Sequence, residues 1–320
     1  MVTVRASAQL PFSNLQFPIP NRARHWKFEI GNWKLAIAHD SRTVTSATAG
    51  LTTRAPEGKC LHRHTAGVTY GSTNGSELLQ RYSELTPTVR TPAEFIERLS
   101  QLPLHYQPGT RWEYGFGFEV MGVVVESVTK KRLGDYLSER LFQPLGMPDT
   151  GFFVPPAKLA RVARPLTASA TTIRTEPPPL DNGGGSSGGI YSTAIDYLRF
   201  AEMLRGYGTF AGKRYLGRKS VDFMTSDQLT PDINVEAFWA GQGGLNRGYG
   251  FGSSVTVRRE SGLGGSAGST GDYNWGGGGG TYFWVDPKEE LSVVFMSAAP
   301  GETRFRMRQL IRAVVLQAIE

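Results

Sequence analysis

The chain has 320 residues, 39% of them hydrophobic, and a formal net charge of +7 from 35 basic and 28 acidic residues. This length allows one large domain or two intimate ones with a sizeable core. The basic residues are scattered rather than gathered in a stripe, which argues against nucleic-acid binding. A single cysteine, Cys60, excludes an internal disulfide framework, and no apolar run is long enough to predict a membrane span.

The N-terminal 60 residues differ from the rest of the chain. Apolar and polar residues alternate on both sides of Gly31-Asn32, which predicts a hairpin over residues 25–38. We expect the remainder of residues 1–60 to be poorly ordered. The first 28 residues are basic, contain no acid and lack an apolar h-region. There is thus no clear signal peptide, only a faint likeness to a transit peptide, and the compartment stays unknown, with the cytoplasm as default.

Helix signals dominate the middle of the chain. Thr91 is followed by Pro92 and then Glu94, the pattern of an N-cap, a first-turn proline and a capping-box acid. Apolar periodicity predicts three further helices, over residues 118–128, 133–142 and 192–204.

The C-terminal part changes to strand periodicity. Three segments are predicted strands: 249–257 (YGFGSSVTV), 280–285 (GTYFWV) and 291–298 (LSVVFMSA). The last two are expected to form an antiparallel hairpin through the turn at 286–290.

A final helix is predicted over residues 303–319. Its apolar stripe, which we expect to cover the sheet, consists of Met307, Ile311, Val314, Val315 and Ala318. The arginines are assigned to a solvated face, and they are Arg304, Arg306, Arg308 and Arg312. Helices in the middle followed by strands and a closing helix predict the α+β class.

Several short motifs match catalytic patterns without the context that those patterns need. G-x-S-x-G occurs at Ser186, Ser187 and Ser266, but a nucleophile elbow requires a strand before the serine and a helix directly after it. Residues 183–188 (GGGSSG) match G-x-G-x-x-G, again without a preceding strand. The Ser-x-x-Lys at Ser127–Lys130 ends an apolar helix instead of opening one. We interpret these motifs as loops and a helix terminus.

Five stretches nevertheless resemble the serine β-lactamase and penicillin-binding-protein superfamily, especially its class C-like (family VIII) esterase branch. They are HTAGVTYG (64–71), YQPGTRWEYGFGFEVMG (106–122), LFQPLGMPDTGFFVP (141–155), GGIYSTAIDYLRFAEML (188–204) and WGGGGGTYFWVDP (275–287). The resemblance covers residues 61–320 as one β-lactamase-related domain. It implies a β-lactamase/transpeptidase-like α+β fold, in which the C-terminal helix covers an antiparallel sheet beside a mainly helical subdomain. Residues 1–60 would be a divergent or incomplete N-terminal part.

By this resemblance, Tyr114 in Tyr114-Gly115-Phe116 takes the place of the family's general base or proton relay. Such a phenol needs a pKa lowered by a nearby cation. The alternative is a buried aromatic residue beside Trp112. Phe116 stands where relatives carry an amide that binds a substrate amide, and this replacement points away from β-lactams and toward esters.

The resemblance also implies that Trp275-Gly276-Gly277 is the triplet that begins the strand along the substrate groove. Gly278 would then supply one N–H of the oxyanion hole. Glycines would let a substrate carbonyl approach the main chain closely. Trp275 replaces a lysine that attracts a lactam carboxylate, which again favours esters.

The family's nucleophile, a Ser-x-x-Lys that opens a helix upstream of His64, does not occur before that residue. We therefore expect the ancestral activity, hydrolysis of a small-molecule ester or amide through an acyl-serine intermediate, to be impaired, and it is uncertain whether the chain is an enzyme. Two alternatives stay open: a pseudoenzyme that binds a ligand or a peptidoglycan-like molecule, and a hydrolase with a relocated serine. We predict no cofactor, no metal and no nucleic acid, and leave the oligomeric state unknown.

Overall fold

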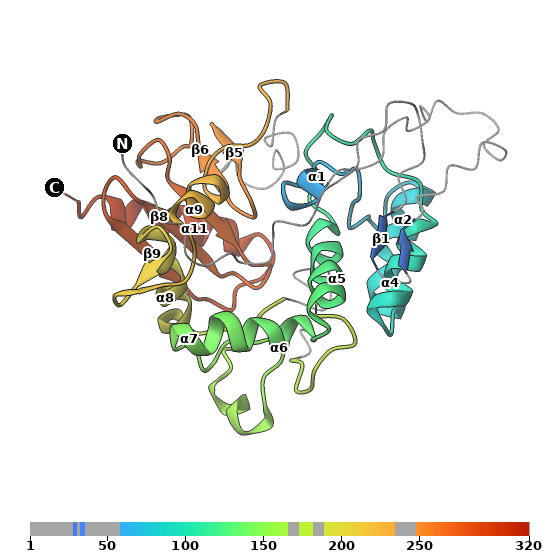
Figure 1. The fold of residues 1–320 in the computed structure, drawn as a ribbon. Coiled ribbons are helices and arrows are strands. Elements are labelled where there is room, and N and C mark those ends of the chain that lie inside the picture. The colour runs from blue at the N-terminus through green and yellow to red at the C-terminus, as the bar shows by residue number, and fades with distance from the viewer. Residues whose placement is uncertain are drawn as a thin grey trace, which may run out of the picture.

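A computed structural model of the chain contains an antiparallel five-stranded sheet in the C-terminal part, in orange and red in Figure 1. Each strand pairs with its sequence neighbours, so no connection crosses over another strand. The strands are β5 Tyr249–Phe251, β6 Thr256–Arg258, β7 Tyr273–Gly276, β8 Tyr282–Asp286 and β9 Leu291–Phe295. The structure describes residues 28–30, 33–35, 58–165, 173–181, 189–233 and 248–319.

Helices cover both faces of this sheet. On one face Phe283 of β8 packs in a core with α8, and on the other the Arg312 guanidinium carbon of α11 lies 5.3 Å from the centre of the Trp284 ring. Because successive residues of a strand point to opposite faces, β8 is buried along its whole length. The two helices are α8 Ala194–Arg205 and α11 Thr303–Leu316.

A mainly helical region lies beside the sheet, to the right in Figure 1. Its core includes Cys60, Tyr82, Phe95 and Phe116. The helices are α1 Gly58–His62, α2 Glu77–Ser83, α3 Leu85–Thr88, α4 Pro92–Ser100 and α5 Gly117–Thr129. Helices on one side and an antiparallel sheet on the other confirm the predicted α+β class.

The start of α4 shows how closely local sequence sets a helix boundary. The Thr91 hydroxyl oxygen accepts a hydrogen bond from the Glu94 N–H at 3.1 Å, as an N-cap should. The Glu94 carboxylate reaches back one residue further than a standard capping box and accepts from the Arg90 N–H at 2.8 Å. The predicted cap at Thr91 is confirmed.

The remaining elements are one long helical run and several short helices and strands. The helix predicted over 133–142 is a continuous run whose middle turn is π-helical: α6 Leu133–Leu137, η1 Ser138–Phe142 and α7 Gln143–Leu145. The shorter elements are η2 Pro156–Arg161, β3 Thr209–Phe210, β4 Lys213–Arg214 and α9 Arg218–Met224.

The hairpin predicted near the N-terminus is present as β1 Phe28–Ile30 and β2 Trp33–Leu35, which pair antiparallel with Ile30 opposite Trp33. The expectation of poor order for the rest of residues 1–57 lies outside the described residues. The division of the chain at residue 60 stays a prediction.

The segment 249–257, predicted as one strand, is two strands, β5 and β6. Ser254 between them has a left-handed φ of 71°, and the Gly252 N–H donates to the Val255 carbonyl at 2.9 Å. This tight turn reverses the chain, and β5 and β6 then pair with each other. The apolar residues Tyr249 and Phe251 before the turn and Val255 and Val257 after it all occupy odd positions, which is why the sequence reads as a single strand.

The face of α11 that meets the sheet also differs from the prediction. Its buried residues are Phe305, Arg308, Arg312 and Leu316. Val314 and Ala318, assigned to the covering stripe, are exposed, whereas Met307, Ile311 and Val315 are half-buried. The assignment of Arg308 and Arg312 to the solvated face is wrong, because the sheet offers both guanidinium groups hydrogen-bond acceptors.

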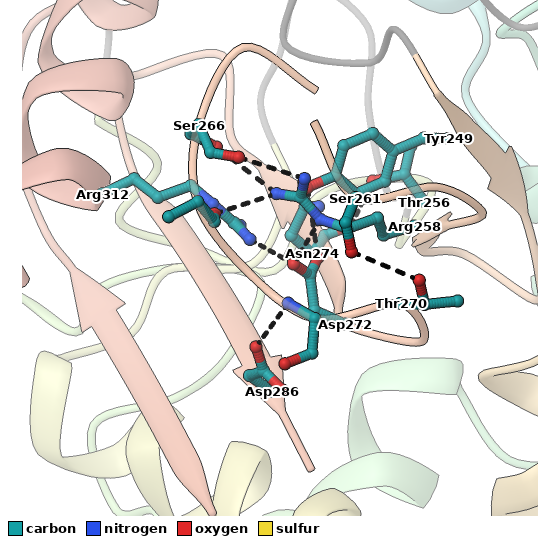
Figure 2. A network of polar contacts seen from close by, with 12 residues as sticks. Tyr249, Thr256, Arg258, Ser261, Ser266, Thr270, Asp272, Asn274, Asp286 and Arg312 are labelled. Atoms are coloured by element: carbon teal, nitrogen blue, oxygen red, sulfur yellow. Dashed lines mark hydrogen bonds and ion pairs between the residues drawn. The ribbon is translucent and has the colours of Figure 1, made fainter. Parts of the chain in front are cut away.

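Asp272 is the acceptor that draws Arg312 inward (Figure 2). Its carboxylate accepts from Arg258 Nε of β6 at 2.7 Å and from Arg312 Nη2 of α11. The Tyr249 hydroxyl donates to its other oxygen at 3.2 Å. All three charged side chains are at most 1% exposed. Arg258 also donates to the carbonyl of Ser266 at 3.1 Å, so this network joins β5, β6, α11 and the loop before β7.

We expect Asp272→Asn to lower the free energy of unfolding by about 3–5 kcal/mol, because it leaves two buried guanidinium groups without their carboxylate. The control is Asp222→Asn, which breaks a solvent-exposed pair with Arg218 and should change it by at most about 0.5 kcal/mol. Chemical denaturation measures both. Equal, small effects for the two variants would show that the buried network contributes little.

Candidate functional site

Tyr114 and Trp275, far apart in the sequence, are in contact. The centres of their rings are 5.5 Å apart, and a side-chain hydrogen bond joins them. Tyr114 lies in the loop before α5, and Trp275 lies on β7. Both also belong to an apolar cluster with Trp112 and Phe251. The structure thus brings the two main predicted site residues together.

Glycines allow the Tyr114 loop to lie against the preceding chain. A Cβ at Gly115 would overlap the carbonyl oxygen of Val68, and one at Gly117 would overlap that of Leu61. Close backbone approach of this kind requires glycine. The sequence Tyr-Gly-Phe-Gly therefore has a packing reason that is independent of any chemistry.

His64 holds the other side of this loop. Its Nδ1 accepts a hydrogen bond from the Gly115 N–H at 3.3 Å, and its ring centre is 4.7 Å from that of Tyr114. The residue is buried and has a left-handed φ of 57°. Burial, with a smaller contribution from His62, lowers the pKa of His64 to about 3, so the imidazole is neutral at physiological pH.

The electrostatic surroundings of Tyr114 differ from those expected of a general base. Burial, followed by the charge of Glu119, raises the pKa of the Tyr114 phenol to about 12, although hydrogen bonds with Tyr70 and Trp275 act in the opposite direction. The expected lowering of this pKa by a cation is therefore wrong for this chain. Tyr114 keeps its proton at neutral pH and can donate it in a hydrogen bond.

The glycine-rich triplet also lies differently from the expectation. Trp275 and Gly276 end β7 instead of beginning a strand, and the chain turns before β8 starts at Tyr282. The Gly280 N–H donates to the Gly277 carbonyl at 3.1 Å, which closes a tight turn. The run of glycines is thus the loop of a hairpin.

Protein groups, not open space, surround most of these glycines. A Cβ at Gly276 would overlap the Arg308 guanidinium, and one at Gly277 would overlap the Thr281 hydroxyl. Gly280 has φ +114°, and its Cβ would approach the backbone nitrogen of Ala299 to 2.9 Å. By contrast, a Cβ at Gly278 or Gly279 would meet nothing within 4 Å.

The amide of Gly278 differs from those of Gly277 and Gly280, which donate to protein carbonyls. Gly278 is exposed, and among the described residues its N–H donates to no protein group. Two arginines of α11 hold the neighbouring carbonyls: Arg308 Nη2 donates to Gly277, and Arg304 Nη1 donates to Gly278 at 3.0 Å. Because the Gly277 carbonyl and the Gly278 N–H belong to one planar peptide unit, Arg308 fixes the direction of that N–H.

Phe116 does not face the candidate site. It is 1% exposed and packs in the helical core, with its ring centre 4.7 Å from that of Tyr70 and 5.5 Å from that of Phe95. An amide in this environment would need buried hydrogen-bond partners. The replacement noted in the sequence is therefore a core residue here.

The serines in catalytic-looking motifs make structural bonds. The Ser127 hydroxyl donates to the Val124 carbonyl at 2.8 Å within α5, and Lys130 caps that helix with a left-handed φ of 58°. The Ser266 carbonyl and hydroxyl both accept from Arg258. Neither serine hydrogen-bonds to Tyr114. Ser186 and Ser187 lie outside the described residues.

Two residues near Tyr114 were not singled out in the sequence. Tyr70 has its ring centre 5.0 Å from that of Tyr114, and its hydroxyl donates to Glu119 Oε1 at 2.7 Å. Glu119 is 1% exposed. The available signal was a single acid in the apolar stretch 118–125, which a surface helix position would explain equally well.

Across the described ranges, no group of three or more His, Cys, Asp and Glu side chains is arranged to hold a metal ion. The described helices also include none that is both long and apolar enough to cross a bilayer.

Comparisons with known proteins identify relatives of this chain. A family model described as Beta-lactamase matches residues 45–316. Protein Rv1367c of Mycobacterium tuberculosis is 33% identical over 244 residues, which are 73% of this chain and 60% of that protein. Lovastatin esterase of Penicillium rubens is 27% identical over 255 residues, covering 73% of this chain and 61% of the esterase. The chain thus spans about 60% of the length of these relatives.

A solved structure shares the fold. EstCE1, described as a hydrolase with promiscuous acyltransferase activity, superposes with a TM-score of 0.64 at 24% identity and covers 84% of this chain and 74% of its own. The predicted β-lactamase-like fold is confirmed by this likeness.

We expect Gly280→Ala to destabilise the protein by about 1–3 kcal/mol, because it places a Cβ at a strained φ and against the Ala299 backbone. Gly279→Ala, one position earlier in the same turn, has free space and should change the free energy of unfolding by at most about 0.5 kcal/mol. Urea denaturation of both variants checks the difference. A tolerated Gly280→Ala would contradict the described turn.

We expect the buried His64 to make the folded protein less stable in acid. Its pKa is lower in the folded than in the unfolded chain, so the unfolded state binds the proton first as the pH falls below about 6.5. We expect the wild-type free energy of unfolding to decrease from pH 6.5 toward pH 3, by up to about 4 kcal/mol from this group. His64→Asn, which tolerates the left-handed φ, should lose stability at neutral pH but show a shallower decrease.

Chemical denaturation of wild type and His64→Asn between pH 6.5 and 4.5 measures the two slopes of stability against pH. A slope that is the same in wild type and His64→Asn would contradict the assignment.

Proposed function

This chain belongs to the beta-lactamase family, and from that membership we propose that Tyr114, Trp275 and Gly278 form an acyl-binding site for neutral carboxylic esters. Its relatives include proteins named as esterases. The observation that carries the proposal is the contact of Tyr114 with Trp275, whose rings are 5.5 Å apart although they come from different regions of the fold. The proposed amide donor, Gly278, follows Trp275 by three residues in the chain.

The side chains around Tyr114 favour a neutral and apolar ligand. The rings of His64, Tyr70 and Trp275 surround it, and His64 is uncharged at physiological pH. An indole at position 275 supplies one N–H donor and an apolar face, but no charge to attract a carboxylate. An uncharged ester fits these groups better than an anionic lactam.

The state of Tyr114 supports binding more than turnover. A phenol with a pKa of about 12 donates a hydrogen bond to an ester oxygen at neutral pH. Ser-x-x-Lys occurs in this sequence only at Ser127–Lys130, and the Ser127 hydroxyl is bonded within its own helix. We infer that this chain binds the ester without rapid hydrolysis, so a ligand-binding pseudoenzyme is the second candidate function.

The 320-residue chain should hydrolyse p-nitrophenyl butyrate no faster than the uncatalysed background. The reason is that loss of a serine nucleophile lowers kcat by about 10⁶ in well-studied hydrolases. The chain should nevertheless bind a slowly reacting ester such as ethyl butyrate, as measured by tryptophan fluorescence or by NMR shifts.

Tyr114→Phe should weaken this binding by about 2- to 10-fold, the effect of one hydrogen bond, and Trp275→Ala should weaken it further. Tyr82→Phe is the control, because its buried hydroxyl donates elsewhere, to the Pro103 carbonyl at 2.9 Å. Rapid hydrolysis that Tyr114→Phe and a serine-directed phosphonate both abolish would instead support a relocated serine, and mass spectrometry would locate it.

A further inference from the structure

The turn between β7 and β8 carries a second exposed amide, that of Gly279. Gly279 is exposed like Gly278, and within the described ranges its N–H also donates to no protein group. A Cβ at either position would meet nothing within 4 Å. The turn therefore has two consecutive N–H donors that no described protein group uses.

Hydrogen bonds on both sides hold the turn in shape. The Gly280 N–H donates to the Gly277 carbonyl at 3.1 Å, and the Ala299 N–H donates to the Gly279 carbonyl at 2.8 Å. Neither Gly278 nor Gly279 has a positive φ, which leaves type I among the standard turns with trans peptides. The two central residues of a type I turn have nearly helical dihedral angles, so their N–H groups point in similar directions, as they do in the first turn of a helix.

Two arginines of α11 fix the direction in which these groups point. Arg308 Nη2 donates to the Gly277 carbonyl, and Arg304 Nη1 donates to the Gly278 carbonyl at 3.0 Å. In a trans peptide the N–H points opposite to the carbonyl of the same unit. Because both carbonyls face α11, the N–H groups of Gly278 and Gly279 both point away from that helix.

The side chain of Trp275 lies on the same side of the sheet. The space that a side chain at Gly276 would fill is occupied by the Arg308 guanidinium. Successive residues of a strand point to opposite faces, so the Trp275 indole lies on the face away from α11. There it contacts Tyr114, and the two N–H groups point toward that side as well.

Arg308 adds a positive charge that no acid in the described structure neutralises. Its side chain is buried, and none of the described carboxylates pairs with it. Burial, followed by the charge of Arg304, lowers the pKa of Arg308 to about 10, so the guanidinium is still protonated at neutral pH. A cation that binds a carbonyl polarises the whole peptide unit, and its N–H becomes a stronger donor.

We propose that the N–H groups of Gly278 and Gly279 together bind the carbonyl oxygen of the ester. Such an oxygen has two lone pairs and can accept both hydrogen bonds. Arg308 and Arg304 are positioning residues that act on this oxygen through the two peptide units. The inference rests on the proposed acyl site, to which it adds a second donor, and it concerns binding alone.

The first test compares ethyl butyrate with butyl ethyl ether, which has a methylene group in place of the carbonyl. Amide NMR spectra of the isotope-labelled wild-type protein follow the titration with each ligand. We expect the ester to move the amide proton signals of both Gly278 and Gly279 downfield, and the ether to move neither of them downfield. A downfield shift of Gly278 alone would overturn the second donor.

The second test uses the ratio of ester affinity to ether affinity, which isolates the contribution of the carbonyl oxygen. Arg308→Met should lower this ratio by about 2- to 10-fold, and Arg304→Met should lower it less, because solvent screens the half-buried Arg304. The control, Arg306→Met, removes the same charge from an exposed position of α11 and should leave the ratio unchanged. An equal loss of affinity for both ligands would show only a loosened turn and would overturn the positioning role.

Arg308→Lys separates charge from packing. It keeps a cation beside the turn, so its ratio should stay above that of Arg308→Met, and an equally low ratio would reject the role of charge. If Arg308→Met does not fold, Arg304→Met at its half-buried position decides, because an unchanged ratio there rejects the positioning role. Ester binding without a shift of Gly279 would reject this inference and leave the proposed function standing. Absence of ester binding would reject the proposed function, and this inference with it.

Discussion

Asp272 accepts hydrogen bonds from Arg258 of β6 and Arg312 of α11, and this buried pairing sets the position of the C-terminal helix on the sheet. The consequence reaches the candidate site. Arg308 lies one helical turn before Arg312, so the rotation that brings Arg312 to Asp272 also brings Arg308 to the carbonyls of Gly277 and Thr281. The hairpin turn that carries Gly278 is thus held from the face of the sheet opposite to Trp275 (Figure 2 shows the Asp272 part of this arrangement).

The parts of the fold that could be predicted from the sequence are those set by contacts between residues close together in the chain. The cap at Thr91, helix α5 and the hairpin of β8 and β9 depend on neighbours within a few residues, and they occur where predicted. The orientation of α11 depends on Asp272, which is 40 positions from Arg312. Arginines on an amphipathic helix ordinarily face solvent, so periodicity alone selects the wrong stripe.

The properties of the candidate site that depend on distant residues also could not be predicted from local sequence. The contact between Tyr114 and Trp275 was expected only through the resemblance to a family, because nothing local links the two residues. The chemical state of Tyr114 was predicted with the wrong sign, since it depends on burial and on Glu119. Glu119 itself resembles a solvent-facing helix residue in sequence. Its burial and the hydrogen bond that it accepts from Tyr70 depend on the tertiary structure.

The hairpin turn between β7 and β8 also sets how its amides exchange hydrogen with water. The N–H groups of Gly277 and Gly280 donate to protein carbonyls, so their exchange requires the turn to open. Gly278 is exposed, and among the described residues its N–H donates to no protein group, so its exchange needs no such opening. Protected and unprotected amides therefore lie within four residues of each other. A molecule that accepts from Gly278 would slow exchange at that position, while the neighbouring amides would continue to report the stability of the turn itself.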